Sequence, residues 1–192
     1  MSPDPGLAPH REAPEQAADI RQLMGGFPTG VSIITATGVD GVNWGMTCSS
    51  LCSVSLDPPI LLICLRAGSP TLGAVLASGR FAVNLLHDQG QQAAELFASG
   101  APDRFDRVAW QAGPGAAGPH LLYASHTIAD CSLFSSHMVG DHVVVMGAVD
   151  NVIPRRPVRP LMYGLRRYLS WPEQSKSRNS PDQDGRLTPY GS

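Results

Sequence analysis

An unusual run of hydroxyl side chains lies between Gly45 and Ser55, where the sequence is GMTCSSLCSVS. If this run is extended, successive side chains point to opposite faces. The hydroxyls on one face would then be those of Thr47, Ser49, Ser53 and Ser55. A row of hydroxyls and strand amides without fixed charge suits a large, flat, neutral heterocycle with polar edges. The alternative is the solvated outer face of a β-strand, where serine and threonine are ordinary.

A candidate anion site begins at Arg66, the last residue of the apolar run ILLICLR. Ser69 and Pro70 then make a strong helix start, because serine caps free amides and proline fits the first helical position. The amino end of a helix offers free N–H groups and a positive dipole end, and Arg66 beside it would grip a phosphate. The alternative is a plain helix cap with a solvated arginine. Together with the hydroxyl run, this site indicates a phosphorylated aromatic cofactor.

Other nucleotide and hydrolase motifs are missing from the sequence. No GxGxxG follows the first predicted strand and no GxxxxGK[ST] occurs, so neither of those nucleotide-binding folds is supported. A Ser-His-Asp hydrolase is disfavoured, because there is no G-x-S-x-G nucleophile elbow.

A third candidate site is the turn that contains Asp141 and His142, together with Tyr163 and Tyr168. A histidine and two tyrosines would stack on a second ring system and form hydrogen bonds with it. The alternative for His142 is a hydrogen-bonded turn histidine. The other histidines have no partner at ligand spacing, so we assign them no role.

The four cysteines, Cys48, Cys52, Cys64 and Cys131, are too few and too scattered for a disulfide framework. The C-x3-C spacing of the first two has no second Cys or His pair that would complete a tetrahedral metal site. We therefore expect reduced thiols in the core and no metal.

Composition limits the class of protein. The chain has 192 residues and a formal net charge of −2, and 43% of its residues are hydrophobic. This length favours one domain with its own core, and the near-neutral charge argues against nucleic acid or an anionic membrane as a partner. No apolar run approaches the ~18–20 residues of a membrane span, and no signal-peptide core is present, so we expect a cytoplasmic protein. Lys176, the only lysine, lies in a polar tail, which disfavours Schiff-base chemistry.

The elements that must position these residues are mostly strands. Periodicity and turn residues predict a domain over 17–170, between a disordered start (1–16) and a polar flexible tail (171–192). The predicted strands are 31–37, 42–48, 51–56, 60–66, 81–86, 123–134 and 142–152. The predicted helices are 17–24, 70–77 and 91–98, and a long surface loop is expected over 100–119. Many strands and few helices indicate a closed or nearly closed β-barrel rather than an alternating βαβ sheet.

Five motifs, in order and at compatible spacing, resemble those of the short-chain flavin reductases, the NAD(P)H:flavin oxidoreductase components of two-component flavin monooxygenases. The motifs are Arg21-x-x-Met24-Gly25-x-Phe27-Pro28-Thr29-Gly30-Val31, Gly45-Met46-Thr47-x-Ser49-Ser50, Ser53-Val54-Ser55-Leu56-Asp57-Pro58-Pro59, Ser78-Gly79-Arg80-Phe81-Ala82-Val83-Asn84-Leu85-Leu86 and Gly140-Asp141-His142. The ordered set is more specific than any one of its members.

The resemblance implies a mainly β, FMN-binding split β-barrel of Greek-key type with a few short peripheral helices, which forms a homodimer in the cytoplasm. Such proteins reduce FMN or FAD with NADH or NADPH and release the reduced flavin to a separate monooxygenase. Hydride passes from C4 of the nicotinamide to N5 of the flavin, while the protein stacks the two rings in line. The sequence leaves open both choices, FMN against FAD and NADH against NADPH.

The resemblance also assigns residues by position. The residues that would line the flavin are Asn43, Trp44, Gly45, Met46, Thr47, Ser49, Ser50, Cys64, Leu65, Arg66, Ser69, Pro70, Thr71, Leu96 and Phe97. Those that would meet the nicotinamide nucleotide are Tyr163, Gly164, Leu165, Arg166 and Tyr168. At the catalytic site, His142 would orient the nicotinamide or shield the site rather than act as a base.

Two features depart from the family pattern. Leu51 stands where the family often has an aromatic residue, and the segment 163–168 shifts a glycine and adds a second arginine. The two arginines, Arg166 and Arg167, would favour the extra phosphate of NADPH or would be solvated. Two other functions use the same barrel: a flavin-binding electron carrier without turnover, and a pyridoxamine-phosphate oxidase-like enzyme.

Overall fold

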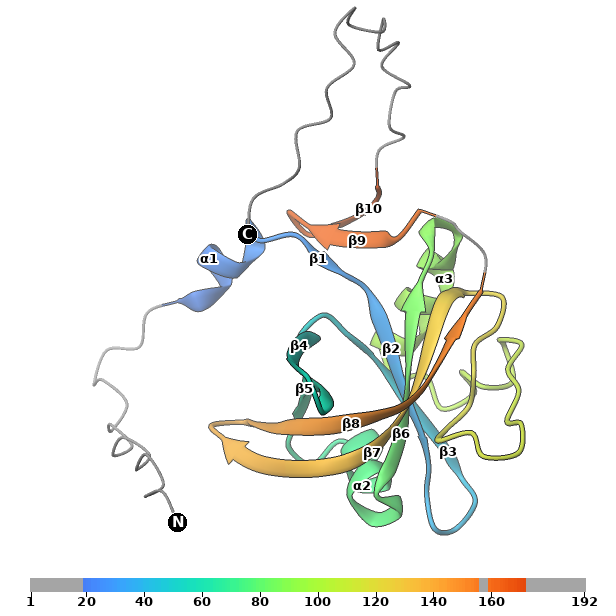
Figure 1. Cartoon of the computed structure of the whole chain (residues 1–192). Coiled ribbons are helices and arrows are strands. Elements are labelled where there is room, and N and C mark those ends of the chain that lie inside the picture. The colour runs from blue at the N-terminus through green and yellow to red at the C-terminus, as the bar shows by residue number, and fades with distance from the viewer. Residues whose placement is uncertain (1–18, 156–158, 172–192) are drawn as a thin grey trace, which may run out of the picture.

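The computed structural model describes residues 19–155 and 159–171. Its strands are β1 Thr29–Gly30, β2 Ser32–Thr37, β3 Asn43–Cys48, β4 Cys52–Leu56, β5 Pro59–Arg66, β6 Arg80–Leu86, β7 Ser125–Val139, β8 His142–Pro154, β9 Leu161–Gly164 and β10 Arg167–Ser170. Its helices are α1 Ile20–Gly25, α2 Pro70–Ser78 and α3 Gln91–Ser99, with a 3-10 turn η1 at Asp88–Gly90. The predicted mainly β fold with a few short helices is confirmed (Figure 1).

A seven-stranded antiparallel sheet forms the barrel, in the order β3-β2-β6-β7-β8-β5-β4. Although β3 and β4 follow each other in the sequence, they form the two opposite edges of this sheet. Ser50, between them, donates its hydroxyl hydrogen to the carbonyl of Cys64 on β5 and accepts the N–H of Cys64 at 2.9 Å. A side chain therefore bridges the seam where backbone pairing stops, as in a split barrel.

The core has two parts because β2 is buried on both of its faces. Ile34 belongs to the cluster inside the barrel, with Phe81 and Val145. Its neighbour Ile33 points the other way, as strand alternation requires, and packs in a second cluster beneath α3. Burying each isoleucine stabilises the fold by about 1.5–3 kcal/mol, so β2 anchors α3 to the barrel.

The loop 100–119 was expected on the surface, and this expectation is only half right. Its last part is buried by a polar network, in which Thr35 donates to the carbonyl of Pro119 at 2.7 Å and Asn84 accepts the N–H of Leu121 at 2.8 Å. In the same network, Oδ1 of Asp130 on β7 accepts the N–H of Ala117 and lies 2.8 Å from Nε2 of His120. Buried polar groups need such partners, and the partners hold the loop against β6 and β7.

Other boundaries also differ from the prediction. The strand expected over 123–134 runs from Ser125 to Val139, and a second sheet of β1, β9 and β10 was not predicted. In Figure 1, α1 and the hairpin of β7 and β8 extend away from the barrel. The predicted disordered start 1–16, and the tail from residue 172, lie outside the described residues.

The four thiols are free, as expected, but only Cys48 and Cys131 are buried. Burial, with smaller contributions from Asp150 and Asp130, raises the pKa of Cys131 to about 12, so this thiol stays protonated. Cys52 is exposed, which contradicts its predicted place in the core. In residues 19–155 and 159–171, no helix is long and apolar enough to cross a membrane, and no group of His, Cys, Asp and Glu is arranged to hold a metal.

Candidate functional site

A cavity of about 500 Å³ opens between β3, the end of β5, the start of α2 and the end of α3. We call it the charged cavity. It is lined by Trp44, Gly45, Met46, Thr47, Arg66, Gly68, Ser69, Pro70, Thr71, Phe97, Ala98, Gly100, Pro102 and Arg104. Most of the residues that the sequence assigned to a flavin therefore meet in one place, although they come from four separate elements.

The turn between β5 and α2 places Arg66 beside the start of the helix. The Ser69 N–H donates to the Arg66 carbonyl at 3.1 Å, and Gly68 has φ +75°, a conformation that favours glycine. The Ser69 hydroxyl accepts the N–H of Leu72 at 3.3 Å, which is the predicted helix cap. The free amides and dipole of α2 and the exposed Arg66 thus converge on the same cavity, an arrangement that favours an anion.

Arg104 is the residue of this cavity that sequence reasoning missed. Its guanidinium lies 5.8 Å from the ring centroid of Trp44 and 6.0 Å from that of Phe97. One donor, Nη1, bonds to the carbonyl of Ala101 at 2.9 Å, and Nε is buried without a partner. Burial lowers the pKa of Arg104. No local sequence pattern singled out Arg104. The neighbouring Phe105 packs its ring edge-on against Phe97, with ring centroids 5.2 Å apart.

A second cavity of about 220 Å³ adjoins the first and shares Thr47 and Ala98 with it. We call it the tyrosine cavity. Its lining is Val31, Thr47, Ser49, Ala98, Tyr163 and Tyr168. The two tyrosines face each other across β9 and β10, with ring centroids 5.1 Å apart. Burial, then Glu95, then Tyr163 raise the pKa of Tyr168, so its phenol keeps its proton at neutral pH and can donate a hydrogen bond.

The hydroxyl run does not act as one row, because the chain turns between β3 and β4. Thr47 donates to the Ala94 carbonyl at 2.6 Å, and Ser50 is committed to Cys64. Ser53 and Ser55 lie on β4 and line neither cavity. The solvated-face alternative therefore holds for these two, while Ser49 remains to present its side chain to the tyrosine cavity.

Besides Ser50 and Leu96, three predicted flavin residues line neither the charged cavity nor the tyrosine cavity. Asn43 accepts a hydrogen bond from Thr37 at 2.8 Å, Leu65 is fully buried in the barrel core, and Cys64 has its backbone bonded to Ser50. Their place in the prediction rested on sequence position alone, which does not report the direction of a side chain.

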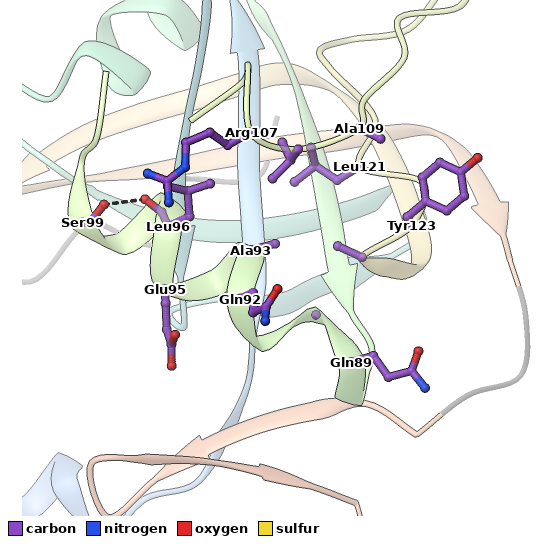
Figure 2. Close-up of a pocket in the computed structure, with 13 residues that line it drawn as sticks. Gln89, Gln92, Ala93, Glu95, Leu96, Ser99, Arg107, Ala109, Leu121 and Tyr123 are labelled. Carbon is purple, nitrogen blue, oxygen red and sulfur yellow. Dashed lines mark hydrogen bonds between the residues drawn. The ribbon is translucent and has the colours of Figure 1, made fainter. Parts of the chain in front are cut away.

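Leu96 faces away from the other predicted residues. It lines a third cavity of about 560 Å³ on the outer side of α3, together with residues of the loops that precede and follow α3 (Figure 2). We call this the outer cavity. Its neighbour Phe97 lines the charged cavity. The two residues are about 100° apart around α3, so they line different cavities.

His142 also lies apart from the predicted nucleotide segment within one chain. It is paired with Arg66 across β5 and β8, and its Nδ1 is 2.8 Å from the carboxylate of Asp141. This contact lowers the pKa of Asp141. The structure thus brings His142 beside the charged cavity and not to Tyr163 or Tyr168.

The segment between the two tyrosines is a tight hairpin turn. Leu165 and Arg166 have φ 52° and 59°, the left-handed region in which non-glycine residues are strained. The N–H of Leu165 donates to the Gly25 carbonyl at 2.8 Å, and Gly164 packs against Pro28. The Arg166 side chain is exposed, so the turn carries its charge on the surface.

Comparison with known families agrees with this geometry. Residues 24–172 match the family described as flavin reductase like domain. The chain belongs to this flavin reductase family. The resemblance predicted from the motifs is confirmed, and with it the split-barrel fold.

Similar proteins share most of the length of this flavin reductase-like chain. It is 48% identical over 155 residues to the flavin reductase (NADPH) of Lentzea aerocolonigenes, covering 81% of this chain and 90% of that protein. It is 39% identical over 185 residues to the flavin reductase (NADH) of Kitasatospora aureofaciens, covering 94% and 96%. It is 37% identical over 145 residues to the reductase subunit HsaB of a flavin-dependent monooxygenase of Mycobacterium tuberculosis, covering 74% and 76%.

A solved structure gives the same fold. The NADH:FAD oxidoreductase of Streptomyces globisporus C-1027, in complex with NAD and FAD fragments, matches with a TM-score of 0.75 at 29% identity, covering 81% of this chain and 93% of that one. The residues of the present flavin reductase-like chain fit such a ligand. The charged cavity offers two cations and a helix amino end, and the adjoining tyrosine cavity offers aromatic rings.

Proposed function

We propose that this protein is an NAD(P)H-dependent flavin reductase that hands reduced flavin to a partner monooxygenase. The observation that carries this proposal is the pair of joined cavities, cationic at one end and aromatic at the other, in a chain of the flavin reductase family. FMN has a phosphate at one end and a flat ring at the other, joined by a ribityl chain. FAD carries the same parts, so we propose either flavin as the substrate.

The chain's own residues bind and orient. Arg66 and the amides at the start of α2 hold the phosphate, and β3 supplies the wall along which the rest of the flavin lies. Tyr163 and Tyr168 close the ring end and exclude water from it. When bound, the nicotinamide and the flavin supply the redox chemistry themselves, as hydride donor and hydride acceptor.

The nucleotide side is proposed to use the segment from Tyr163 to Tyr168, with Gly164, Leu165 and Arg166 in the turn. His142 is proposed to orient or shield the nicotinamide. Since one chain holds His142 apart from Tyr163 and Tyr168, both can serve one site only where two copies of the chain meet.

A homodimer is therefore part of the proposal. Apolar side chains lie exposed on the parts that extend from the barrel: Phe134, Met138 and Val139 on the β7–β8 hairpin, Leu56 on β4, and Ile20, Leu23, Met24 and Phe27 in and after α1. Exposed apolar surface of this extent is typical of protein–protein contacts. One chain has a mass of 20.3 kDa. Light scattering coupled to size-exclusion chromatography should give twice that mass, and the mass of a single chain would contradict this part of the proposal.

The partner and the compartment follow from the proposed activity. A reductase subunit of a flavin-dependent monooxygenase is among the relatives, which supports transfer of reduced flavin to a separate oxygenase. Reduced nicotinamide nucleotides are supplied in the cytoplasm, so we propose that location. No nucleic acid or membrane partner is proposed.

The deciding experiment follows oxidation of NADH and of NADPH at the reduced-nicotinamide absorbance, with and without added FMN, FAD or riboflavin. We expect oxidation that saturates with free flavin, and the two saturation curves rank the flavins and the nucleotides. If flavin binds but neither nucleotide is oxidised, the protein is a flavin carrier and the reductase proposal is wrong.

The role of His142 has its own test. His142→Ala is expected to raise the KM for the reduced nucleotide severalfold while the Kd for flavin changes little. His137→Ala is the matched control, because His137 is exposed on the same hairpin and lines none of the cavities described above. An unchanged KM for the nucleotide in His142→Ala would refute the role.

A further inference from the structure

The charged cavity contains cations without a matching anion. Arg66 and Arg104 line it, and no aspartate or glutamate does. Among the described residues, no carboxylate lies within ion-pair distance of either arginine: Oδ1 of Asp103 lies 3.8 Å from Nη1 of Arg107, and Asp141 pairs with His142. Arg66 makes only a minor contribution to lowering the pKa of Asp141. Two positive charges and a helix amino end therefore face one cavity, which is a site for a dianion.

Arg104 is the more informative of the two cations because it is buried. Its residue is only 7% exposed, yet a guanidinium has five N–H donors and the structure gives it one hydrogen bond, from Nη1 to Ala101. A buried charge without a counter-charge is costly. An anion in the cavity would offset that cost and take up the unused donors.

The aromatic rings fix the direction in which Arg104 acts. The guanidinium carbon of Arg104 lies over the Trp44 and Phe97 rings, 5.8 and 6.0 Å from their centroids, and such cation–π contacts stabilise the cation and restrict its position. The Ala101 carbonyl holds one corner. The planar fork is thus pre-organised before any ligand arrives, and this lowers the entropy cost of binding.

The distribution of charge separates the phosphate end of the site from the ring end. No cation lines the tyrosine cavity, whose polar side chains are Thr47, Ser49 and the two tyrosines. Trp44, against which Arg104 packs, lies near the start of β3, and Ser49 follows its end. At about 3.3 Å per residue, these two positions are about 16 Å apart along the strand. Arg104 therefore lies with Arg66 and α2, away from the tyrosines.

We propose that Arg104 binds the phosphate of the flavin as a second cation, opposite Arg66 and the amino end of α2. This inference rests on the proposed flavin-binding function and goes beyond it, because it makes the phosphate the part of the ligand that the protein selects. It predicts that the chain discriminates FMN from riboflavin, and that a buried arginine provides a large part of this discrimination.

The test measures Kd for FMN and for riboflavin by quenching of flavin fluorescence with the full chain, without nucleotide. Arg104→Gln is expected to raise the Kd for FMN about 10- to 100-fold, which corresponds to the loss of a charge-assisted hydrogen bond. The Kd for riboflavin should change less than about threefold, because riboflavin has no phosphate for Arg104 to bind. Arg104→Lys should recover part of the FMN affinity, because it restores the charge but not the planar fork.

Arg107→Gln is the matched control. It removes the same charge three residues away, but Arg107 lines the outer cavity and lies beside Asp103, so its FMN affinity should equal that of the unaltered chain. Riboflavin binding reports whether each variant is folded at the site.

Three outcomes overturn the proposal, and a fourth overturns the function instead. Equal losses for FMN and riboflavin in Arg104→Gln would assign Arg104 to the ring or to the fold, and unchanged FMN affinity would show that it binds nothing. An Arg107→Gln loss as large as that of Arg104→Gln would indicate a general charge effect. If the unaltered chain binds neither flavin, the proposed flavin reductase function fails.

Discussion

Helix α3 lines two cavities of similar size. One contains side chains of both charges, and in the other the charged side chains are all positive. The outer cavity, about 560 Å³, contains Glu95 and Arg107 (Figure 2). Each has a partner: Nε2 of Gln91 donates to Glu95 at 2.8 Å, and Oδ1 of Asp103 lies 3.8 Å from Nη1 of Arg107. The charged cavity, about 500 Å³, contains Arg66 and Arg104 without a carboxylate. Balanced charges need no ligand, whereas unbalanced ones favour an anion.

This difference shows which property of a cavity indicates function. By volume the outer cavity is the larger, and it holds one predicted site residue, Leu96. The charged cavity collects the helix cap, the arginines and the aromatic wall. Unsatisfied donors and unpaired charge, rather than size, distinguish the site, because a folded protein normally satisfies both.

The largest expected difference between the two sides of α3 is that between Phe97 and Leu96. Phe97 is 2% exposed and packs on Phe105 at 5.2 Å, so Phe97→Ala should lower the free energy of unfolding by about 3–5 kcal/mol. Leu96 is half-buried, and Leu96→Ala should cost about 1–2 kcal/mol. Urea denaturation measures both. FMN affinity should fall in Phe97→Ala alone, and an equal fall in Leu96→Ala would place the flavin on the wrong side of α3.

A substitution at Gly45 on β3 tests the same side of the charged cavity, because Gly45 packs against the Phe97 ring. A Cβ at Gly45 would lie 2.7 Å from Cε1 of Phe97 and 3.2 Å from the carbonyl of Ile34. Gly45→Ala should therefore cost about 1–3 kcal/mol of stability, displace the Phe97 ring and weaken FMN binding. Thermal denaturation and flavin titration measure the two effects.

The control for that substitution is Gly73→Ala. Gly73 lies inside α2 with nothing within 4 Å of a Cβ, so alanine should stabilise the helix by up to about 1 kcal/mol. Opposite signs at the two glycines would support close packing of β3 on Phe97. Stabilisation at both positions would show that the wall is loose.

Much of this site can be predicted from the sequence, because its features depend on residues that are close together in the chain. The cap at Ser69 and Pro70, the arginine that ends β5 and the turn glycine at position 68 depend on neighbours a few residues apart. Short-range rules of this kind fix the anion end of the site before the fold is known. Short apolar runs bounded by turn residues likewise predict a mainly β barrel, since these signals are local as well.

The missed features depend on distant contacts. Arg104 lies in a loop rich in glycine, proline and alanine that local rules place on the surface, and it is buried by Trp44 and Phe97 from other elements. The hydroxyl run seemed continuous, but the barrel seam divides it at Ser50, which bonds to β5. The resemblance assigned Leu96 and Phe97 to the flavin by position, and position in the sequence does not say which cavity each side chain of α3 lines.

The turn between β9 and β10, the two strands that carry Tyr163 and Tyr168, offers a smaller test. Leu165 is 63% exposed and has φ 52° in the turn between the two tyrosine-bearing strands. Asparagine tolerates this conformation better than leucine, so Leu165→Asn should raise the free energy of unfolding by about 1 kcal/mol. Leu169→Asn, on the regular strand β10, should not stabilise the protein. A loss of stability in Leu165→Asn would show that the leucine side chain, rather than the backbone, matters at this turn.

The smallest expected effect is that of salt concentration on flavin affinity, which tests only the charges of the two cavities. Because Arg66 and Arg104 lie without a counter-charge in the cavity, FMN affinity should fall about two- to fivefold between 50 and 300 mM NaCl, as screening weakens the attraction of the phosphate. Riboflavin affinity should stay nearly constant. Arg107→Gln should leave the salt dependence of FMN unchanged, since the charges of the outer cavity are already balanced. A salt dependence that is the same for both flavins would mean that the unpaired arginines do not meet the phosphate, and the contrast between the two sides of α3 would then rest on packing alone.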